Sequence, residues 1–395
     1  MMQWEATYKI TTPMFLAGAE QDKPPELRLP SFKGLLRFWF RAVALPKLGK
    51  WEEVQKLEKE IFGSTERQSS FLLGLDLAKP ERMEDIDFRR KYGLIYLGHG
   101  LVDFRGELQR PYYKGSSVFT LRLLFKKKNI SKDVEFFLPL TLKALGLFGG
   151  AGARSRRGFG SLSLLTLSLD GQRVWNAITN ISELVIKQKE LLNALELKTE
   201  DGKDLPEYTA FSGRTRIWIG KTGNKAIDLL NDIGLELLRY RSFGKEKNGK
   251  HVLPSGEEAE QNFAADHDLI MQFCKTGEIE KHPARVVFGL PHNYFFSQSK
   301  DIVQIQPYGE TGRRASPLFI HIHDLGKNGY AAVFTLFPAQ FLPQKTEMVI
   351  SVKQKNERKA RYKKWLNYDE NYINFHIIEK FMERPAFSQK VVVWP

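Results

Sequence analysis

Three cations in one stretch of the chain are the first residues whose spacing indicates a chemistry. Lys33, Arg37 and Arg41 recur every fourth residue, which places them along one face of a helix. No carboxylate of that helix neutralises them, and each like-charged pair costs roughly a few tenths of a kcal/mol. A bound phosphate would relieve this repulsion, so the stripe is a candidate RNA contact. A solvated polar face is the alternative.

A segment rich in glycine and arginine, residues 149–161, is the second candidate. It holds Arg154, Arg156 and Arg157 between glycines, and such a loop can bind phosphates through main-chain N–H groups and guanidinium groups together. Phe159 is then available to stack on a base. The segment lacks the Gly-Lys-Ser/Thr of a Walker loop and the glycine order of a dinucleotide site. The alternative is a helix-to-strand turn whose arginines face water.

Basic segments recur in the second half of the chain. Residues 285–291 and 309–318 each join a strand-like run to a basic or glycine-containing turn, and the latter supplies Arg313 and Arg314 as further candidate RNA contacts. Seven cations between 353 and 364 face only Glu357; they form either an electrostatic surface for nucleic acid or a solvated helix.

The sequence offers little for catalysis. Its eight histidines are scattered, and the local groupings are His267 beside Asp266 and Asp268, and His321 with His323 on one face of a strand. No acidic or histidine partner stands at metal-ligand spacing from the latter pair, and no nucleophile elbow or His-Glu-x-x-His motif is present. We therefore predict no catalytic residue, no metal ligand and no cofactor.

The elements expected in the first 170 residues follow the order of a βαββαβ ferredoxin-like unit with insertions. Alternation and β-branched content predict strands, and apolar spacing predicts helices. The predicted strands are 3–11, 70–78, 92–98, 116–125 and 159–169, and the predicted helices are 31–46, 51–61 and 133–148.

The second half repeats this theme less clearly. Predicted helices are 176–197, 225–241, 257–273, 356–366 and 369–382, and predicted strands are 285–289, 302–306, 315–323, 330–337 and 390–394. The predicted fold class is α+β, with tandem ferredoxin-like (RRM-like) domains at 1–175 and 176–395, the second carrying helical insertions.

Composition bounds the class of protein and its partner. The 395 residues are 42% hydrophobic and 27% charged, with 60 Lys+Arg against 46 Asp+Glu and a formal charge of +14. This charge indicates a polyanionic partner such as nucleic acid or a membrane surface. One cysteine, Cys274, allows no internal disulfide, and no apolar run is long enough to span a bilayer. We expect a cytoplasmic protein that binds RNA or DNA and does not engage a membrane.

Four separated parts of the chain, the first made of two runs, resemble a known family in the same order. The runs Ile10–Ala19 and Glu26–Ala42 are similar to the opening of the first subunits of the Cmr complex, the type III-B CRISPR effector. Residues 149–161 resemble the glycine-rich signature of the RAMP superfamily, to which that family belongs. Residues 285–291 and 313–318 are similar to the family's second-half segments.

This resemblance implies a non-catalytic, RNA-binding subunit of a ribonucleoprotein that acts in antiviral defence. Its implied partners are the other Cmr subunits and single-stranded guide or target RNA, contacted near the 3′ end of the guide. Two alternatives stay open. One is a metal-independent RAMP endoribonuclease, which would need a histidine or tyrosine base beside a lysine. A histidine within hydrogen-bond reach of the Arg154–Arg157 loop would distinguish it. The other is an architectural subunit whose basic surface binds acidic proteins.

Overall fold

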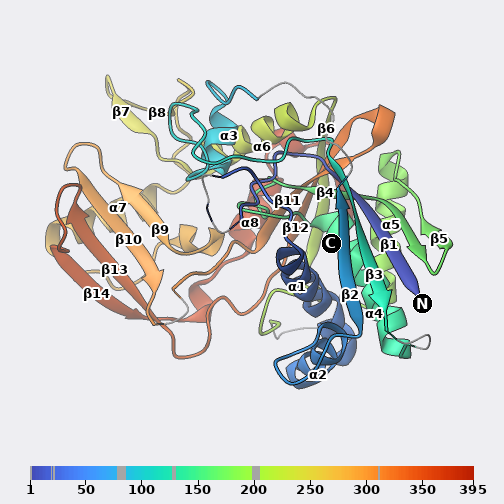
Figure 1. Ribbon diagram of the computed structural model, residues 1–395. Coiled ribbons are helices and arrows are strands. Elements are labelled where there is room, and N and C mark those ends of the chain that lie inside the picture. The colour runs from blue at the N-terminus through green and yellow to red at the C-terminus, as the bar shows by residue number, and fades with distance from the viewer. Residues whose placement is uncertain are drawn as a thin grey trace.

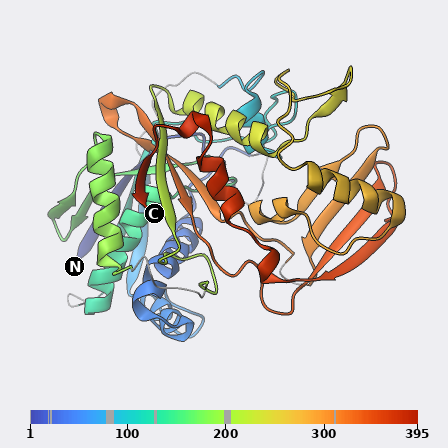
Figure 2. The ribbon, with the colours of Figure 1, turned by 180° about the vertical axis from the view of Figure 1, so that it is seen from behind.

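A computed structural model describes residues 2–18, 20, 23–77, 86–126, 130–197, 205–309 and 312–395. Three sheets organise these residues, as Figures 1 and 2 show from opposite sides. Two of the sheets have the strand order of a ferredoxin-like unit, and the third is built from insertions. The predicted α+β class with tandem ferredoxin-like domains is confirmed.

The first sheet has the antiparallel order β2-β3-β1-β4-β5. Its first four strands and the helices α1 and α4 follow each other as βαββαβ, and the strand order matches that of the ferredoxin-like fold, with β5 added at one edge. The elements are β1 (Gln3–Ile10), α1 (Leu29–Leu48), α2 (Trp51–Phe62), β2 (Phe71–Leu77), α3 (Tyr92–Leu97), β3 (Val118–Phe125), α4 (Lys132–Phe148), β4 (Leu162–Leu169) and β5 (Gln172–Trp175).

The second sheet has the order β11-β12-β6-β15, again antiparallel throughout. With its two helices it forms a second βαββαβ unit, preceded by α5 (Ile181–Ala194). Its elements are β6 (Arg216–Gly223), α6 (Ala226–Arg241), β11 (Leu318–Asp324), β12 (Tyr330–Leu336), α8 (His376–Met382) and β15 (Val391–Trp394).

The third sheet, with the order β14-β13-β10-β9, comes from two insertions into the second unit. One insertion lies between α6 and β11 and the other between β12 and α8. The first carries β7 (Lys245–Lys247), β8 (Lys250–Val252), α7 (Ala264–Thr276), the 3₁₀ turn η1 (Ala284–Phe288), β9 (His292–Phe295) and β10 (Asp301–Pro307). The second carries β13 (Glu347–Gln354) and β14 (Tyr362–Asn367). We call this third sheet the insertion sheet.

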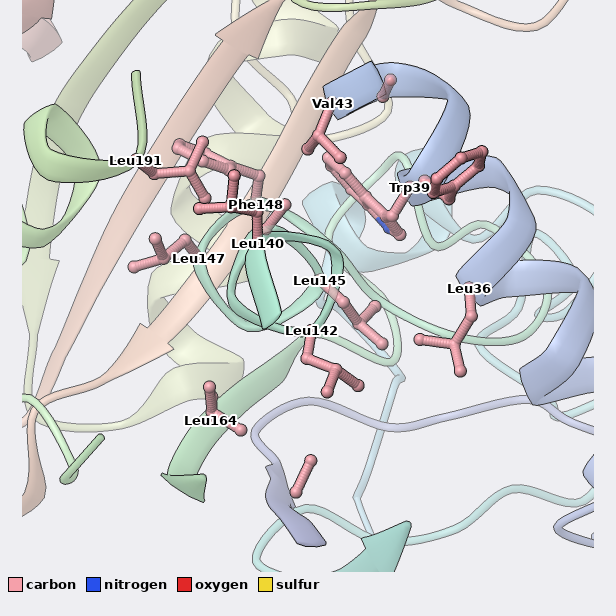
Figure 3. Packing of buried hydrophobic residues seen from close by; sticks show 14 of the residues in the cluster. Leu36, Trp39, Val43, Leu140, Leu142, Leu145, Leu147, Phe148, Leu164 and Leu191 are labelled. Carbon is pink, nitrogen blue, oxygen red and sulfur yellow. The ribbon is translucent and has the colours of Figure 1, made fainter. Parts of the chain in front are cut away.

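The two ferredoxin-like units stack in layers, with α1 and α4 of the first unit between the two sheets. Helix α4 is buried over most of its surface because the first sheet covers one side and β11 and β12 approach the other. Figure 3 shows Leu142, Leu145 and Phe148 of α4 meeting Leu36 and Trp39 of α1. Helices α6 and α8 cover the opposite face of the second sheet. One continuous core therefore joins the two units.

Three predicted elements are wrong. Residues 92–98 form helix α3 rather than a strand, because Gly93 packs directly on Gly234 of α6. Residues 285–289 form a 3₁₀ turn. Residues 356–366 form a hairpin and strand β14 instead of a helix. Helix α3 packs on α6, which is distant in the sequence, whereas β14 pairs with β13, the strand just before it.

Candidate nucleic-acid interface

The glycine–arginine loop, residues 149–161, is a joint between the two units. Its glycines serve internal packing, because a Cβ at Gly152 would lie 2.5 Å from the carbonyl oxygen of Phe15 and one at Gly160 would overlap that of Ala151. The loop bonds to the second unit through Ile320 N–H, which donates to the carbonyl of Arg156 at 2.9 Å. The glycines therefore have a packing role. The expectation that they also admit a ligand to the backbone stays a prediction, and Gly150 and Gly152 line a cavity between the loop and Ser31–Leu35 of α1.

Arg156 is held inside this joint. Its guanidinium donates to the carbonyl of Ser316 at 2.9 Å and lies 4.5 Å from the ring centre of Phe319 and 5.3 Å from that of Phe38. Burial, with repulsion from Arg314, lowers the pKa of Arg156 to about 10. The side chain ties α1 to β11 and is not free to bind RNA.

Arg154 faces outward from the same loop. Its guanidinium donates twice to the main-chain carbonyl of His99, at 3.1 and 2.5 Å, and the residue is exposed. Burial and then repulsion from Arg313 and Arg110 lower the pKa of Arg154. Arg313 is exposed and Arg110 half-buried, and within the described residues neither forms an ion pair.

Cations continue inward from Arg154. Arg157 is half-buried, and its pKa is lowered by desolvation and further by Arg154. Arg241, at the end of α6, is buried with its guanidinium 4.3 Å from the ring centre of Phe288, and its Nε has no hydrogen-bond partner in the described chain. Burial lowers the pKa of Arg241 to about 10, with added repulsion from Arg157 and Arg285.

These six side chains form one set, which we call the arginine tract: Arg110, Arg154, Arg157, Arg241, Arg285 and Arg313. It runs from exposed side chains to a buried end along the seam between the units. Asp266 pairs with Arg285 at 3.3 Å and is the one carboxylate bonded to the tract in the described residues. Burying cations without counter-charges is costly, so an anion at the seam would offset that cost.

Of the three cations on α1, Lys33, Arg37 and Arg41, two have a carboxylate partner that was not predicted from the sequence. Glu58 of α2, itself buried, accepts from Arg37 at 3.0 Å and from Arg41 at 2.5 and 2.8 Å. The carboxylate that the α1 sequence lacks therefore comes from the next helix. Lys33 alone keeps no ion pair among the described residues, and its pKa is lowered by burial and by Arg37 and Lys126. Because Arg37 and Arg41 turn towards α2, the structure does not join the stripe and the loop into one groove.

Two other predicted contacts are also enclosed. Phe159 is fully buried and packs edge-on against Phe15 at 5.6 Å, so it cannot stack on a base in this conformation. Arg314 is half-buried with its guanidinium 5.5 Å from the ring centre of Phe341. Of the predicted residues, Arg154, Arg157 and Arg313 come together. Arg110 and Arg241 were missed, because nothing in their local sequence marks them.

The histidine pair on β11 is part of the joint. His321 Nδ1 lies 2.8 Å from the carbonyl oxygen of Gly149, and its Nε2 lies 3.1 Å from Nδ1 of His323. Both rings are buried, and burial lowers the pKa of His321 to about 3 and that of His323 to about 4. His267 stacks on Phe243 at 3.7 Å. Within the residues that the structure describes, no three His, Cys, Asp or Glu side chains are grouped to hold a metal ion.

Two histidines lie at the arginine tract. His292 is at its buried end, where burial and then the charges of Arg241, Arg285 and Arg157 lower its pKa. His99 is at the exposed end. Its imidazole is on an exposed residue, and burial and the charges of Arg154 and Arg157 lower its pKa. The ring is therefore largely neutral at pH 7. Across the described helices, none has the length and apolar character needed to cross a membrane.

Comparison with known proteins agrees with the sequence resemblance. Residues 7–163 match the family model of the RAMP superfamily. The chain is 27% identical over 331 residues to the CRISPR system Cmr subunit Cmr1-1 of Pyrococcus furiosus, which covers 81% of this chain and 83% of that protein. It is also 27% identical over 186 residues to Cmr1-2 of the same organism, covering 42% of this chain and 97% of that protein.

Solved structures share the fold. The crystal structure of Cmr1 from Pyrococcus furiosus in the apo form matches with a TM-score of 0.55 and 21% identity, covering 100% of this chain and 99% of that chain. A chain of the type III-B Cmr-beta complex, determined by cryo-EM with cognate target RNA and AMPPnP, matches with a TM-score of 0.52 and 14% identity, covering 97% and 99%. The resemblance to the first subunits of the Cmr complex is confirmed.

Proposed function

Because residues 7–163 match the RAMP superfamily and most of the chain resembles Cmr1, we propose that it is an RNA-binding subunit of a type III-B CRISPR (Cmr) effector ribonucleoprotein. The family resemblance implies that it contacts guide or target RNA near the 3′ end of the guide, beside the other Cmr subunits. A related complex has been determined with cognate target RNA bound.

The arginine tract is the observation that supports RNA as the partner. At its exposed end Arg154 is repelled by Arg110 and Arg313, and none of the three has an ion pair in the described residues. Phosphate diesters supply the missing charge, and guanidinium groups bind them through paired N–H donors. An acidic protein surface would also meet this charge, so binding of RNA itself is the property to measure.

The experiment measures binding of a fluorescein-labelled single-stranded RNA to the full chain by anisotropy. We expect Arg154→Ala with Arg313→Ala to weaken binding about tenfold or more, since charge-assisted bonds contribute about 1.5–3 kcal/mol each before solvent screening. Arg67→Ala is the matched control, because Arg67 is an exposed arginine paired with Glu60 on the α2 side. Unchanged affinity in the double variant would contradict the proposal.

We propose further that the chain binds RNA without cutting it. The predicted histidine groupings are enclosed: His321 and His323 lie in the joint, and His267 is stacked on Phe243. None of them can reach a strand lying on the arginine tract in this conformation.

His99 favours the second candidate, a metal-independent endoribonuclease. A largely neutral imidazole beside two arginines can accept a proton from a ribose 2′-hydroxyl while the guanidinium groups hold the phosphate. Labelled RNA incubated with the full chain in EDTA distinguishes the two. Discrete products that disappear in His99→Ala and persist in His376→Ala would establish the enzyme, whereas intact RNA supports the non-catalytic subunit.

A further inference from the structure

The insertion sheet has one covered and one uncovered face. Helix α7 crosses the covered face (Figure 2), where alternate residues such as Val303, Ile305 and Ile350 are buried. The residues between them point to the other side, which Figure 1 shows with no element in front of it. On that face lie Asn293, Phe295, Ile302, Gln304, Gln306, Val349, Ser351, Lys353, Lys363 and Trp365.

Two large aromatic side chains are exposed on this uncovered face. Phe295 on β9 is 56% exposed and Trp365 on β14 is 44% exposed. The Nζ of Lys363 lies 4.6 Å from the centre of the Trp365 ring. Exposed aromatic rings of this kind offer surfaces on which nucleic-acid bases can stack.

The strand register places the two aromatic residues at diagonal corners. Trp365 pairs with Val349, Val349 pairs with Gln306, and Phe295 pairs with Ile302. The corners are therefore three strand spacings of about 4.8 Å and four residue steps of about 3.3 Å apart, or about 20 Å. Between them runs a polar row of Asn293, Gln304, Ser351 and Lys363, whose amide, hydroxyl and ammonium groups are suited to base edges and phosphates.

The charge around this face is mainly positive, although Glu347 lies on the face and Glu357 lies in an adjoining turn. Lys353 and Lys363 stand on the face itself, and the adjoining turns at its Phe295 end add four more cations: Lys300, Lys355, Arg358 and Lys359. None of these six has an ion pair within the described chain. By contrast, Arg361 and Lys364 of the same segment pair with Asp301 and Glu278.

From this geometry we propose that the uncovered face of the insertion sheet binds single-stranded RNA, at a site separate from the arginine tract. Bases stack on Trp365 and Phe295, and the lysines neutralise the phosphates between and beside them. The proposal extends the RNA-binding function proposed above to a second surface. RNA fits better than a protein partner, because the two aromatic rings are separated by a polar row rather than joined in one apolar patch.

The test measures binding of a labelled oligouridylate to the full chain by anisotropy. We expect Trp365→Ala with Phe295→Ala to weaken binding at least about fivefold, since each stacked base contributes measurably by alanine substitution. Phe136→Ala on α4 is the matched control, an exposed aromatic residue of the first unit. Circular dichroism and the thermal midpoint establish that each variant is folded.

A conservative variant gives a second readout. Trp365→Phe keeps a stacking ring, so we expect affinity close to that of the parent chain, while the part of the tryptophan fluorescence change on RNA binding that comes from Trp365 is lost. If Trp365→Phe shows the parental fluorescence change, no base stacks on that ring.

The outcomes separate this proposal from the proposed function. Loss of affinity only in Arg154→Ala with Arg313→Ala would overturn the sheet site and leave the proposed function standing. Unchanged affinity in both sets of variants would overturn both. If the aromatic variants bind RNA normally but fail to assemble with the other subunits of the complex, the face is a protein interface and the proposal is wrong.

Discussion

Arg154 and Arg156 are two residues apart and have different roles. Arg156 is enclosed by Phe38, Phe319 and the carbonyl of Ser316, whereas Arg154 is exposed. The sequence shows both as equal members of one basic loop. Only the second unit, packed over the loop, distinguishes them.

We expect Arg156→Ala to lower the free energy of unfolding by about 1–3 kcal/mol, from the lost charge-assisted hydrogen bond and ring contacts. Arg156→Lys should not restore it, because an ammonium group cannot stack as a planar guanidinium does. Urea denaturation measures the change. Arg154→Ala should stay within about 0.5 kcal/mol of the parent chain, as surface changes do, and an equal loss in the two variants would contradict the assignment.

The His321–His323 pair predicts a dependence of stability on pH. Burial holds the pKa of these rings at about 3 and about 4, below the ordinary value of 6.5. Below pH 6.5 the unfolded chain binds protons that the folded chain does not, so stability falls with pH from 6.5 towards 4. The slope is at most about 1.4 kcal/mol per pH unit for each ring.

Urea denaturation of the parent chain and of His323→Gln between pH 7.5 and 5 tests this dependence. In His323→Gln, the free energy of unfolding should fall less steeply as the pH is lowered, because one fewer histidine takes up a proton on unfolding. His376→Gln, an exposed histidine paired with Glu379, is the control. A parent chain whose stability is flat between pH 6.5 and 5 would contradict the prediction.

At the scale of elements, α3 illustrates how a short segment can be misread. Tyr92–Leu97 is a short apolar and aromatic run that resembles a strand, but its helix is fixed by contact of the Gly93 and Gly234 backbones. The seam at α3 also carries His99, whose carbonyl binds Arg154. The position of α3 on α6 therefore affects the exposed end of the arginine tract.

A methyl group added at Gly234 would overlap the backbone of Gly93. We expect Gly234→Ala to destabilise the chain by about 1–3 kcal/mol and to weaken RNA binding by shifting α3. Gly34→Ala is the matched change, because a Cβ there meets nothing within 4 Å in the middle of α1. In Gly34→Ala the free energy of unfolding should rise by about 0.5–1 kcal/mol. Thermal melting and anisotropy of both variants are the measurements.

Much of the first unit could be predicted from its sequence. The strands of alternating burial, 3–11 and 116–125, and the helices 31–46 and 133–148 follow local periodicity, and the structure places β1, β3, α1 and α4 there. In the insertion sheet one strand, 302–306, was predicted in this way, and the structure places β10 there; β9, β13 and β14 were not predicted. Its strand β14 is rich in lysine and joins the sheet through β13 alone, so no local apolar pattern marks it.

The candidate site was predictable only in part, because its residues come together through contacts between elements that are distant in the sequence. Arg154, Arg157 and Arg313 are visible as basic residues near glycines, but Glu58 neutralises two predicted cations from a different helix. Arg241 joins the arginine tract from the end of an ordinary amphipathic helix. Counter-charges and neighbours are set by tertiary packing.

Across the whole molecule, the charge of +14 predicts that RNA binding is strongly salt-dependent. A single strand releases counterions with a slope of log K against log salt of about −0.7 per neutralised phosphate, so five contacts give about −3.5. Arg154→Ala with Arg313→Ala should reduce the slope by about 1.4 units, while Trp365→Phe should leave it unchanged. Anisotropy titrations from 50 to 200 mM salt measure it, and a salt-insensitive affinity would contradict the prediction.

The insertion sheet also imposes an order on folding. Its central pair, β10 and β13, comes from segments separated by the β11–β12 hairpin, and Tyr308 N–H donates to the carbonyl of Glu347 where the two segments meet. Formation of that hairpin shortens the loop that the pairing must close, which reduces the entropic cost of closure. The strands β9 and β10 pair within one insertion and β13 and β14 within the other, but we expect the complete insertion sheet to form only after the β11–β12 hairpin and to open when that hairpin loosens.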